Sequence, residues 1–250
     1  MKIVICMKRV PDTAAKIKVA ASGKSIDSTG IEYVINPYDE YGIEEALRIK
    51  EKHGQGEVII LSLGSEKATS VIRNALAMGA DRAILLKDES DNYDSFATAN
   101  ALAKVLKEIN PDIIFFGKQA VDSDNSQVGS MVAQILNLPC VTVINKLEIS
   151  DKKAIAHRQI EGGIEVVETN LPAVFTAQKG LNEPRYASLK GIMAAKKKSL
   201  EEKTPEKVDS RIEIINMELP PMRKAGKIVG EGADAVPELL KLLQFEAKVL

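Results

Sequence analysis

Residues 113–129 read IIFFGKQAVDSDNSQVG. A short apolar run at 113–116 is followed by a polar loop, and from Val128 onward apolar residues recur at helical spacing. The glycine at 117 allows close approach of the backbone to a ligand, and Asp124, Asn125 and Ser126 are residue types that cap helices. Open α/β sheets bind ligands where a strand ends in such a loop. The stretch therefore predicts either a phosphate site at a helix N-terminus or a polar loop that only caps its own helix.

The same alternation of strand and helix continues through the first 140 residues. Continuous apolar runs predict strands at Ile3–Cys6, Val58–Leu63, Ala83–Leu86 and Ile113–Phe116. Spacing of i, i+3, i+4 predicts helices around 43–47, 71–76, 102–109 and 128–135. Asn36 and Ser65 are expected to cap the first two helices, with Pro37 at the first helical position. Strands without polar alternation are covered on both faces, so we expect a doubly wound, mostly parallel α/β sheet.

The pattern changes after Pro139. Strand-like runs at 141–144, 154–156, 164–167 and 173–176 follow one another with short connections, which predicts added antiparallel or edge strands. Beyond 198 come a charged stretch, a short strand-like run at 211–215 and a helix around 239–243. This part holds too few apolar residues for its own core. We therefore expect an α/β domain over 1–198 and a C-terminal arm over 199–250 that packs on another molecule.

Composition narrows the class of protein. The 250 residues include 34 Lys and Arg against 35 Asp and Glu, a formal net charge of −1, which argues against nucleic-acid binding. No apolar run is long enough to cross a bilayer, and the one at the N-terminus is too short for a secretory signal. Cys6 and Cys140 each lie in an apolar run, so buried reduced thiols and a cytoplasmic location are expected.

Apparent catalytic motifs do not hold up. Gly23-Lys24-Ser25 lacks the earlier glycine of a phosphate-binding loop and predicts a turn. The glycines at 230 and 232 imitate a dinucleotide fingerprint, but too little chain follows to complete the unit. His53 and His157 lack metal-ligand spacing, and no nucleophile with a partner base is apparent. We expect no catalytic residues and no metal site in this chain.

A second notable segment is 181–198. From Arg185 to Lys198 it holds five basic residues and no acidic one, with Tyr186, Leu189, Ile192 and Met193 at near-helical spacing. Two interpretations stay open: a helix whose apolar stripe joins the core, or an exposed apolar anchor in a basic frame that suits a partner with an acidic rim. Spacing alone favours the core.

Several blocks together resemble one family. They are Asn36-Pro37 ahead of Glu44-Glu45-Ala46, residues 75–82, Gly117-Lys118-Gln119-Ala120, Arg158 with Glu161-Gly162-Gly163, Leu171–Val174 and the whole run 181–198. In this order, and spread from Lys8 to Lys198, they closely resemble electron-transfer flavoprotein β subunits.

The resemblance implies a fold similar to adenine-nucleotide α-hydrolases and a heterodimer with an α subunit that carries FAD. Such a pair shuttles electrons from dehydrogenases, such as acyl-CoA dehydrogenases, to an acceptor, so the β chain is a carrier subunit and not a catalyst by itself. The residues agree, because the chain has no cysteine cluster, haem motif or tryptophan to hold an electron.

The family's nucleotide contacts fall on Cys6, Asn36, Pro37, Tyr38, Asp39, Leu63, Phe116, Gly117, Lys118, Gln119, Ala120, Val121, Asp122, Ser123, Asp124, Asn125, Ser126 and Gln127. Its partner-docking contacts fall on Asn182, Glu183, Pro184, Arg185, Tyr186, Leu189, Lys196, Lys197 and Lys198, with Leu189 in the place of the leucine that inserts into a dehydrogenase.

The resemblance leaves the nucleotide open. Asn36-Pro37-Tyr38-Asp39 and Ser126-Gln127-Val128-Gly129 are similar to members that hold a second FAD and bifurcate electrons from NADH, whereas the Arg158–Gly163 block and residues 182–186 are similar to members that bind AMP as a structural ligand. We expect AMP, with loop amides on its phosphate and groups near Cys6 and Leu63 along the adenine. A stand-alone adenine-nucleotide-binding protein is a further alternative, although the Ser-Gly-Gly-x-Asp-Ser loop of related ATP pyrophosphatases is absent.

Overall fold

The structure, a computed structural model, describes residues 1–90, 93–222 and 225–250, and a nine-stranded sheet forms its centre. The strand order is β11-β5-β4-β1-β6-β10-β7-β8-β9. The strands predicted in the first half are present as β1 (Lys2–Cys6), β4 (Glu57–Gly64), β5 (Arg82–Lys87) and β6 (Ile113–Gly117). All of these pair in parallel, which confirms the doubly wound α/β prediction.

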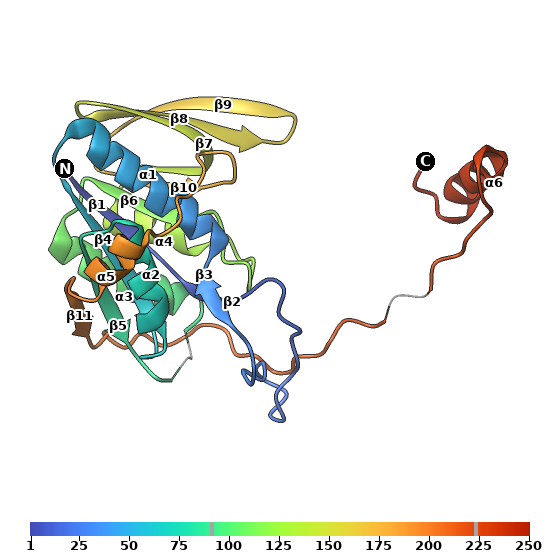
Figure 1. Cartoon of the computed structure of the whole chain (residues 1–250), viewed down its shortest axis with the longest axis horizontal. Coiled ribbons are helices and arrows are strands. Elements are labelled where there is room, and N and C mark those ends of the chain that lie inside the picture. The colour runs from blue at the N-terminus through green and yellow to red at the C-terminus, as the bar shows by residue number, and fades with distance from the viewer. Residues whose placement is uncertain (91–92, 223–224) are drawn as a thin grey trace.

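Helices cover both faces of the sheet (Figure 1). One apolar layer joins the sheet to α1 (Pro37–His53), α2 (Ala68–Met78) and the end of α5 (Leu189–Ala195). The other layer joins it to α3 (Ser95–Ile109) and α4 (Val128–Leu136). Side chains of β1 alternate between the two layers, with Ile3 and Ile5 in the first and Val4 and Cys6 in the second. Burial on both faces explains why these strands lack polar alternation.

The strands after Pro139 agree with the sequence only in part. β7 (Cys140–Ser150), β8 (Lys153–Ile160) and β9 (Gly163–Asn170) form the expected antiparallel extension. β10 (Ala173–Ala177), however, returns to the middle of the sheet and pairs in parallel with both β6 and β7. The prediction that 173–176 is antiparallel or at an edge was therefore wrong. All five residues of β10 are buried, as a central strand requires.

Two predicted helix caps are absent. Asn36 precedes α1, but its side chain makes no capping hydrogen bond. Ser65 lies three residues before α2, where Lys67 occupies the cap position. Gly23 stands in a turn with a φ of +66°, next to the bridge between Val19 and Ile26, so the predicted turn there is confirmed. On either side of this turn in the chain, β2 (Arg9–Pro11) and β3 (Tyr33–Ile35) pair as a separate two-stranded antiparallel sheet.

Residues beyond 198 first add an edge strand to the sheet and then leave it. β11 (Leu200–Lys203) pairs in parallel with β5 at one edge, a strand that the sequence did not indicate. The run 211–215 is not a strand; Arg211 N and Ile212 N instead donate to Asp94 Oδ2 at 2.5 and 3.1 Å. The chain then extends away from the body to η1 (Ala233–Ala235), α6 (Val236–Lys241) and η2 (Leu242–Glu246), where a helix was expected (Figure 1).

Within the described residues, no helix is long and apolar enough to cross a bilayer. The same residues contain no group of three or more His, Cys, Asp or Glu that could hold a metal ion.

Candidate functional site

The loop 117–127 and the first turn of α1 meet at the carboxyl ends of β1 and β6, and we call this region the mouth. The chain leaves β1 on one side toward β4 and β5, and β6 lies on the other side, so this is the topological switch point of the sheet. Ligands of open α/β proteins bind at such a point. The loop 117–127 and the start of α1 both lie here, because Asn36 and Asp39 are hydrogen-bonded to the loop. The structure thus brings together the two blocks that the sequence separates by about eighty residues.

Asn36 ties the loop to α1. Its Nδ2 donates to Gln119 O and to Asp39 Oδ1, both at 2.9 Å, and its Oδ1 accepts from Val121 N at 3.1 Å. The side chain is only 1% exposed, so leaving these groups unpaired would be costly. Asn36 therefore shapes the loop instead of capping its helix.

Asp39 supports the loop from below. Its Oδ1 accepts from Gly117 N at 2.9 Å and its Oδ2 accepts from Lys8 N at 2.7 Å. Burial raises the pKa of Asp39 to about 7, against the lowering effect of these hydrogen bonds and of the one from Asn36. Burial, reinforced by the charge of Asp39, also raises the pKa of Cys6, so this thiol is not a thiolate.

Gly117 cannot be replaced without strain. A Cβ at this position would lie 2.5 Å from Asp39 Oδ1 and 2.6 Å from Tyr38 Cβ. The glycine thus lets the loop pass directly over the first turn of α1, where its amide reaches the carboxylate of Asp39.

The acidic and amide residues of the loop do not cap α4. Asp124 accepts from Gln119 Nε2, Ser126 Oγ donates to Gln119 Oε1, and Asn125 Nδ2 donates to Ser95 Oγ. Gln127 occupies the cap position without a side-chain hydrogen bond. The prediction that these residues cap the helix was therefore wrong, and no described side chain caps the first turn of α4. Amides of a first helical turn lack partners within the helix, so a ligand or water must satisfy them.

Lysines flank the mouth. Lys8 Nζ lies 2.7 Å from Asp122, and Lys118 Nζ lies 5.0 Å from the centre of the Tyr38 ring. Cys6 is 5% exposed and Leu63 is half-buried, and both belong to the same apolar layer. Lys8 was not predicted to lie at the mouth, because a single lysine after a strand carries no pattern.

The segment 181–198 is anchored on α1. Asn182 Nδ2 donates to Tyr41 O and Glu45 Oε2, both at 2.9 Å. Arg185 Nε donates to Glu44 Oε2 at 2.7 Å, and its terminal nitrogens reach both oxygens of Glu51. Burial pulls the pKa of Glu44 upward, but hydrogen bonds from Arg185 and Arg48 bring it below its ordinary value. Glu44 and Glu51 thus fix the start of the segment as carboxylates, a role that the sequence did not reveal.

Beyond this anchor the apolar side chains point to solvent. Tyr186 is 99% exposed, Leu189 83%, Met193 71% and Ile192 46%. The helix itself is present as α5, but the interpretation of its stripe as core is wrong. Only Ala195, at the end of α5, belongs to the core. Contiguous exposed apolar side chains in a basic setting are typical of a docking surface.

The three lysines that end the segment differ. Lys196 and Lys197 are exposed, whereas Lys198 Nζ donates to Leu76 O at 2.9 Å and to Ala80 O at 2.6 Å. Of the other docking positions, Glu183 is exposed and Pro184 is half-buried.

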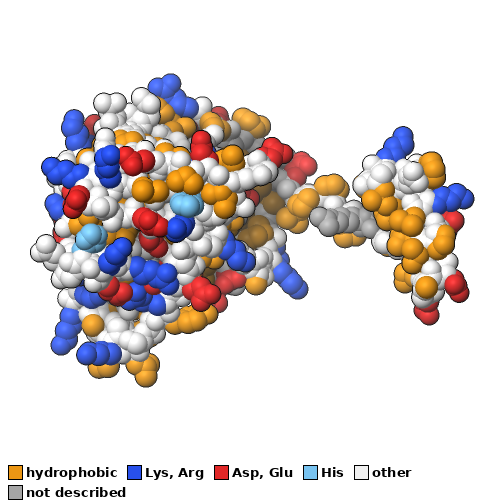
Figure 2. Space-filling view, turned by 90° about the horizontal axis from the view of Figure 1, so that it is seen from above, with side chains coloured by type: hydrophobic (Ala, Val, Ile, Leu, Met, Phe, Trp, Pro, Cys, Tyr) orange, Lys and Arg blue, Asp and Glu red, His pale blue; other side chains and the backbone are white. Residues whose placement is uncertain are grey.

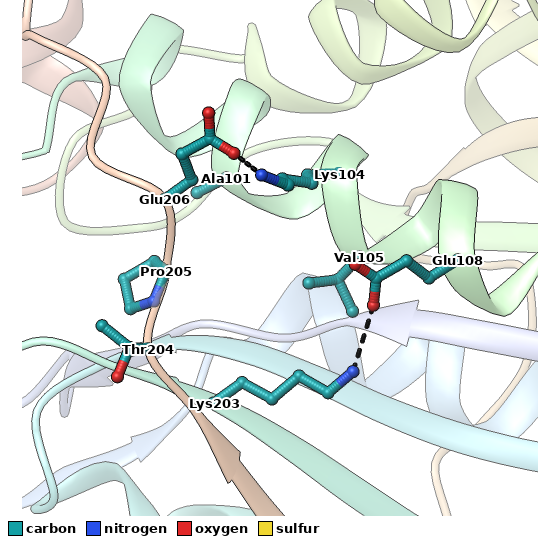
Figure 3. A pocket seen from close by; sticks show the side chains of 8 residues that line it. All are labelled: Ala101, Lys104, Val105, Glu108, Lys203, Thr204, Pro205 and Glu206. Carbon is teal, nitrogen blue, oxygen red and sulfur yellow. Dashed lines mark hydrogen bonds and ion pairs between the residues drawn. The ribbon is translucent and has the colours of Figure 1, made fainter.

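A cavity of about 180 Å³ lies elsewhere, between α3 and the chain after β11 (Figure 3). Lys203 pairs with Glu108 across it and Lys104 pairs with Glu206. None of the residues predicted to contact a nucleotide lines this cavity, so the switch point of the sheet stays the candidate site.

Fold and surface together define a doubly wound α/β protein with a polar loop at its switch point and a helix, α5, whose apolar side chains are exposed. Over residues 24–208 the chain matches the electron transfer flavoprotein domain family. It is 44% identical to an electron transfer flavoprotein subunit beta of Bacillus subtilis, over all of both chains. It is also 44% identical to such a subunit of Syntrophomonas wolfei, over all of this chain and 98% of that one, and 38% identical to a mitochondrial one of Oryza sativa subsp. indica over all of both.

The chain therefore belongs to the electron transfer flavoprotein family, as a β subunit.

Proposed function

We propose that this chain pairs with an α subunit that carries FAD and that the pair carries electrons from dehydrogenases, such as acyl-CoA dehydrogenases, to an acceptor in the cytoplasm. The β-subunit name of its relatives supports the pairing. The observation that carries the docking role is Leu189, 83% exposed on a helix whose preceding segment is fixed by carboxylates of α1. Free Cys6 and Cys140 suit a reducing compartment.

We further propose that the mouth binds AMP as a structural ligand. The residues present fit a phosphate: the loop passes a glycine that leaves no space for a side chain, the first turn of α4 lacks a side-chain cap, and Lys118 lies at the loop together with Lys8, which is paired with Asp122. The nucleotide would stabilise the folded loop by mass action and would not exchange electrons. FAD, bound by the α subunit, supplies the redox chemistry.

A second candidate is a bifurcating β subunit with FAD in this mouth. The observation that favours it is the sequence of Asn36–Asp39 and of Ser126–Gly129, which is similar to that of bifurcating members. In the structure Asp39 lies beneath the loop, where it accepts from Gly117 N and Lys8 N. A flavin would need the same amides for its pyrophosphate, so the two ligands compete for one site.

The test is a count of cofactors on the purified heterodimer. We expect one flavin and one AMP per pair, measured by absorbance after acid release and by chromatography of the extract. Two FAD per pair without AMP would replace the AMP proposal with the bifurcating one. A stable lone chain that hydrolyses ATP, with no α subunit recovered from its source, would contradict both and support a stand-alone nucleotide-binding protein.

A further inference from the structure

Two cationic side chains attach the docking helix α5 to α2. One belongs to α2 and contacts the end of α5, and the other follows α5 and contacts the end of α2. Arg73 of α2 donates through NH1 to Ala195 O and Lys198 O, both at 2.7 Å, at the end of α5. Lys198, just after α5, donates to Leu76 O and Ala80 O at the end of α2. Each helix therefore has its C-terminal carbonyls satisfied by a cation from the other element, where the helix dipole favours positive charge.

The two helices are also in close contact along their length. A Cβ at Gly191 of α5 would lie 2.3 Å from Ala77 O of α2, so only glycine permits this approach. Ala195 is 2% exposed and packs into the apolar layer shared with α2. At the start of α5, Ser188 accepts from Gly191 N at 3.0 Å and caps the helix.

A seven-residue helix with most of its apolar side chains in solvent would not hold its shape alone. Its order must come from its attachments, and burial of a single alanine provides little. Partial burial lowers the pKa of Lys198. Two carbonyl acceptors offset the cost of burying its ammonium group.

We propose that Arg73 and Lys198 form a reciprocal clasp that pre-organises α5, and that both are positioning residues for docking, because they hold Leu189 and Met193 in a fixed arrangement before a partner arrives. The inference rests on the proposed docking function. Pre-organisation lowers the entropy cost of association, so loss of the clasp should weaken docking even though Leu189 and Met193 themselves are unchanged.

The test uses the heterodimer with Arg73→Gln and, separately, Lys198→Met. Hydrogen exchange of the amides of 189–195 should become about tenfold faster or more in each variant, since each loses two charge-assisted hydrogen bonds. With a reduced acyl-CoA dehydrogenase as electron donor, the KM for the heterodimer should rise several-fold while kcat at saturation stays unchanged.

Two further variants act as controls. Lys197→Met removes the same charge from the same segment without touching the clasp, so hydrogen exchange of 189–195 should match that of the unmodified protein. Its KM shows how much the loss of one positive charge alone raises the KM. Arg73→Lys keeps a cation that reaches one carbonyl and should recover part of the protection.

Unchanged exchange in both clasp variants would overturn the inference. Faster exchange with a KM equal to that of Lys197→Met would overturn the positioning role. If Leu189→Ala left the KM unchanged, the docking proposal itself would be wrong. This variant therefore separates a failure of the clasp inference from a failure of the docking proposal. Should Arg73→Gln fail to fold, Lys198→Met carries the same test.

Discussion

Leu189 is the side chain whose removal should affect docking most directly. Leu189→Ala should lower kcat/KM for electron transfer from a partner dehydrogenase by roughly 5- to 30-fold, the effect of losing about 1–2 kcal/mol from the centre of an interface. Nucleotide content and the unfolding midpoint should not change, because the side chain is 83% exposed. The matched control is Ile135→Ala, another exposed aliphatic side chain but on α4. A loss of stability in Leu189→Ala, or an equal kinetic effect of Ile135→Ala, would contradict the docking role.

Asp39 should make stability depend on pH. Its pKa is about 7 in the folded protein and near 3.8 when unfolded, so the folded state binds the extra proton between these values. Stability should therefore fall as pH rises from about 4 to about 7, by about 4 kcal/mol at most, and then level off. Asp39→Asn resembles the protonated acid and lacks this titration. Urea unfolding at pH 5 and pH 8 should show the unmodified protein losing stability relative to Asp39→Asn; a constant difference would exclude a raised pKa.

The contact between the mouth loop and α1 depends on the missing side chain at Gly117. Gly117→Ala should destabilise the protein by about 1–3 kcal/mol and reduce its nucleotide content, because the new methyl would overlap Asp39 and Tyr38. Gly163→Ala, where no atom lies within 4 Å, is the control. Unfolding midpoints and acid-released nucleotide measure both effects. Equal behaviour of the two alanine variants would mean that the loop can move away from α1 at no cost.

Some elements could be predicted from the sequence, and others could not, for physical reasons. The strands β1, β4, β5 and β6 are buried on both faces, so their apolar runs identify them. β10 has the same signature, but its place between β6 and β7 depends on a return across the sheet that no local pattern encodes. β11, Leu200-Glu201-Glu202-Lys203, is an edge strand whose pairing uses only the backbone, so its charged side chains conceal it.

The candidate site shows the same division. The sequence predicts that residues 117–127 lie at a strand end and residues 36–39 at a helix start. It does not predict that Asn36 binds the loop instead of capping α1, or that Asp39 binds the loop as well. A helical apolar stripe has the same spacing whether it packs in the core of the protein or is exposed as a contact surface. Only the structure reveals that the stripe containing Leu189 is exposed.

At the scale of the whole molecule, α1 connects the two candidate sites. Its first turn carries Asp39 beneath the mouth loop, and one to three turns later Glu44 and Glu51 hold Arg185. Both sites therefore rest on one helix that is packed into the core through Ile43 and Leu47. A bound nucleotide would stabilise the first turn of α1, and through α1 it would also stabilise the anchored start of segment 181–198.

The arm beyond β11 exposes many apolar side chains. Ile215, Met222 and Ile228 are 75%, 97% and 88% exposed, and hydrophobic side chains gather on the separate terminal segment (Figure 2). An exposed apolar surface of this kind is typical of a site that binds another protein. Trypsin should therefore cleave the isolated chain after Lys227 or Lys241 at least about tenfold faster than the heterodimer, because the α subunit would cover the arm. The α/β domain should survive in both samples and serves as the internal control. Equal cleavage rates would mean that the α subunit leaves the arm uncovered, and resistance in the isolated chain would mean that the arm packs on its own domain.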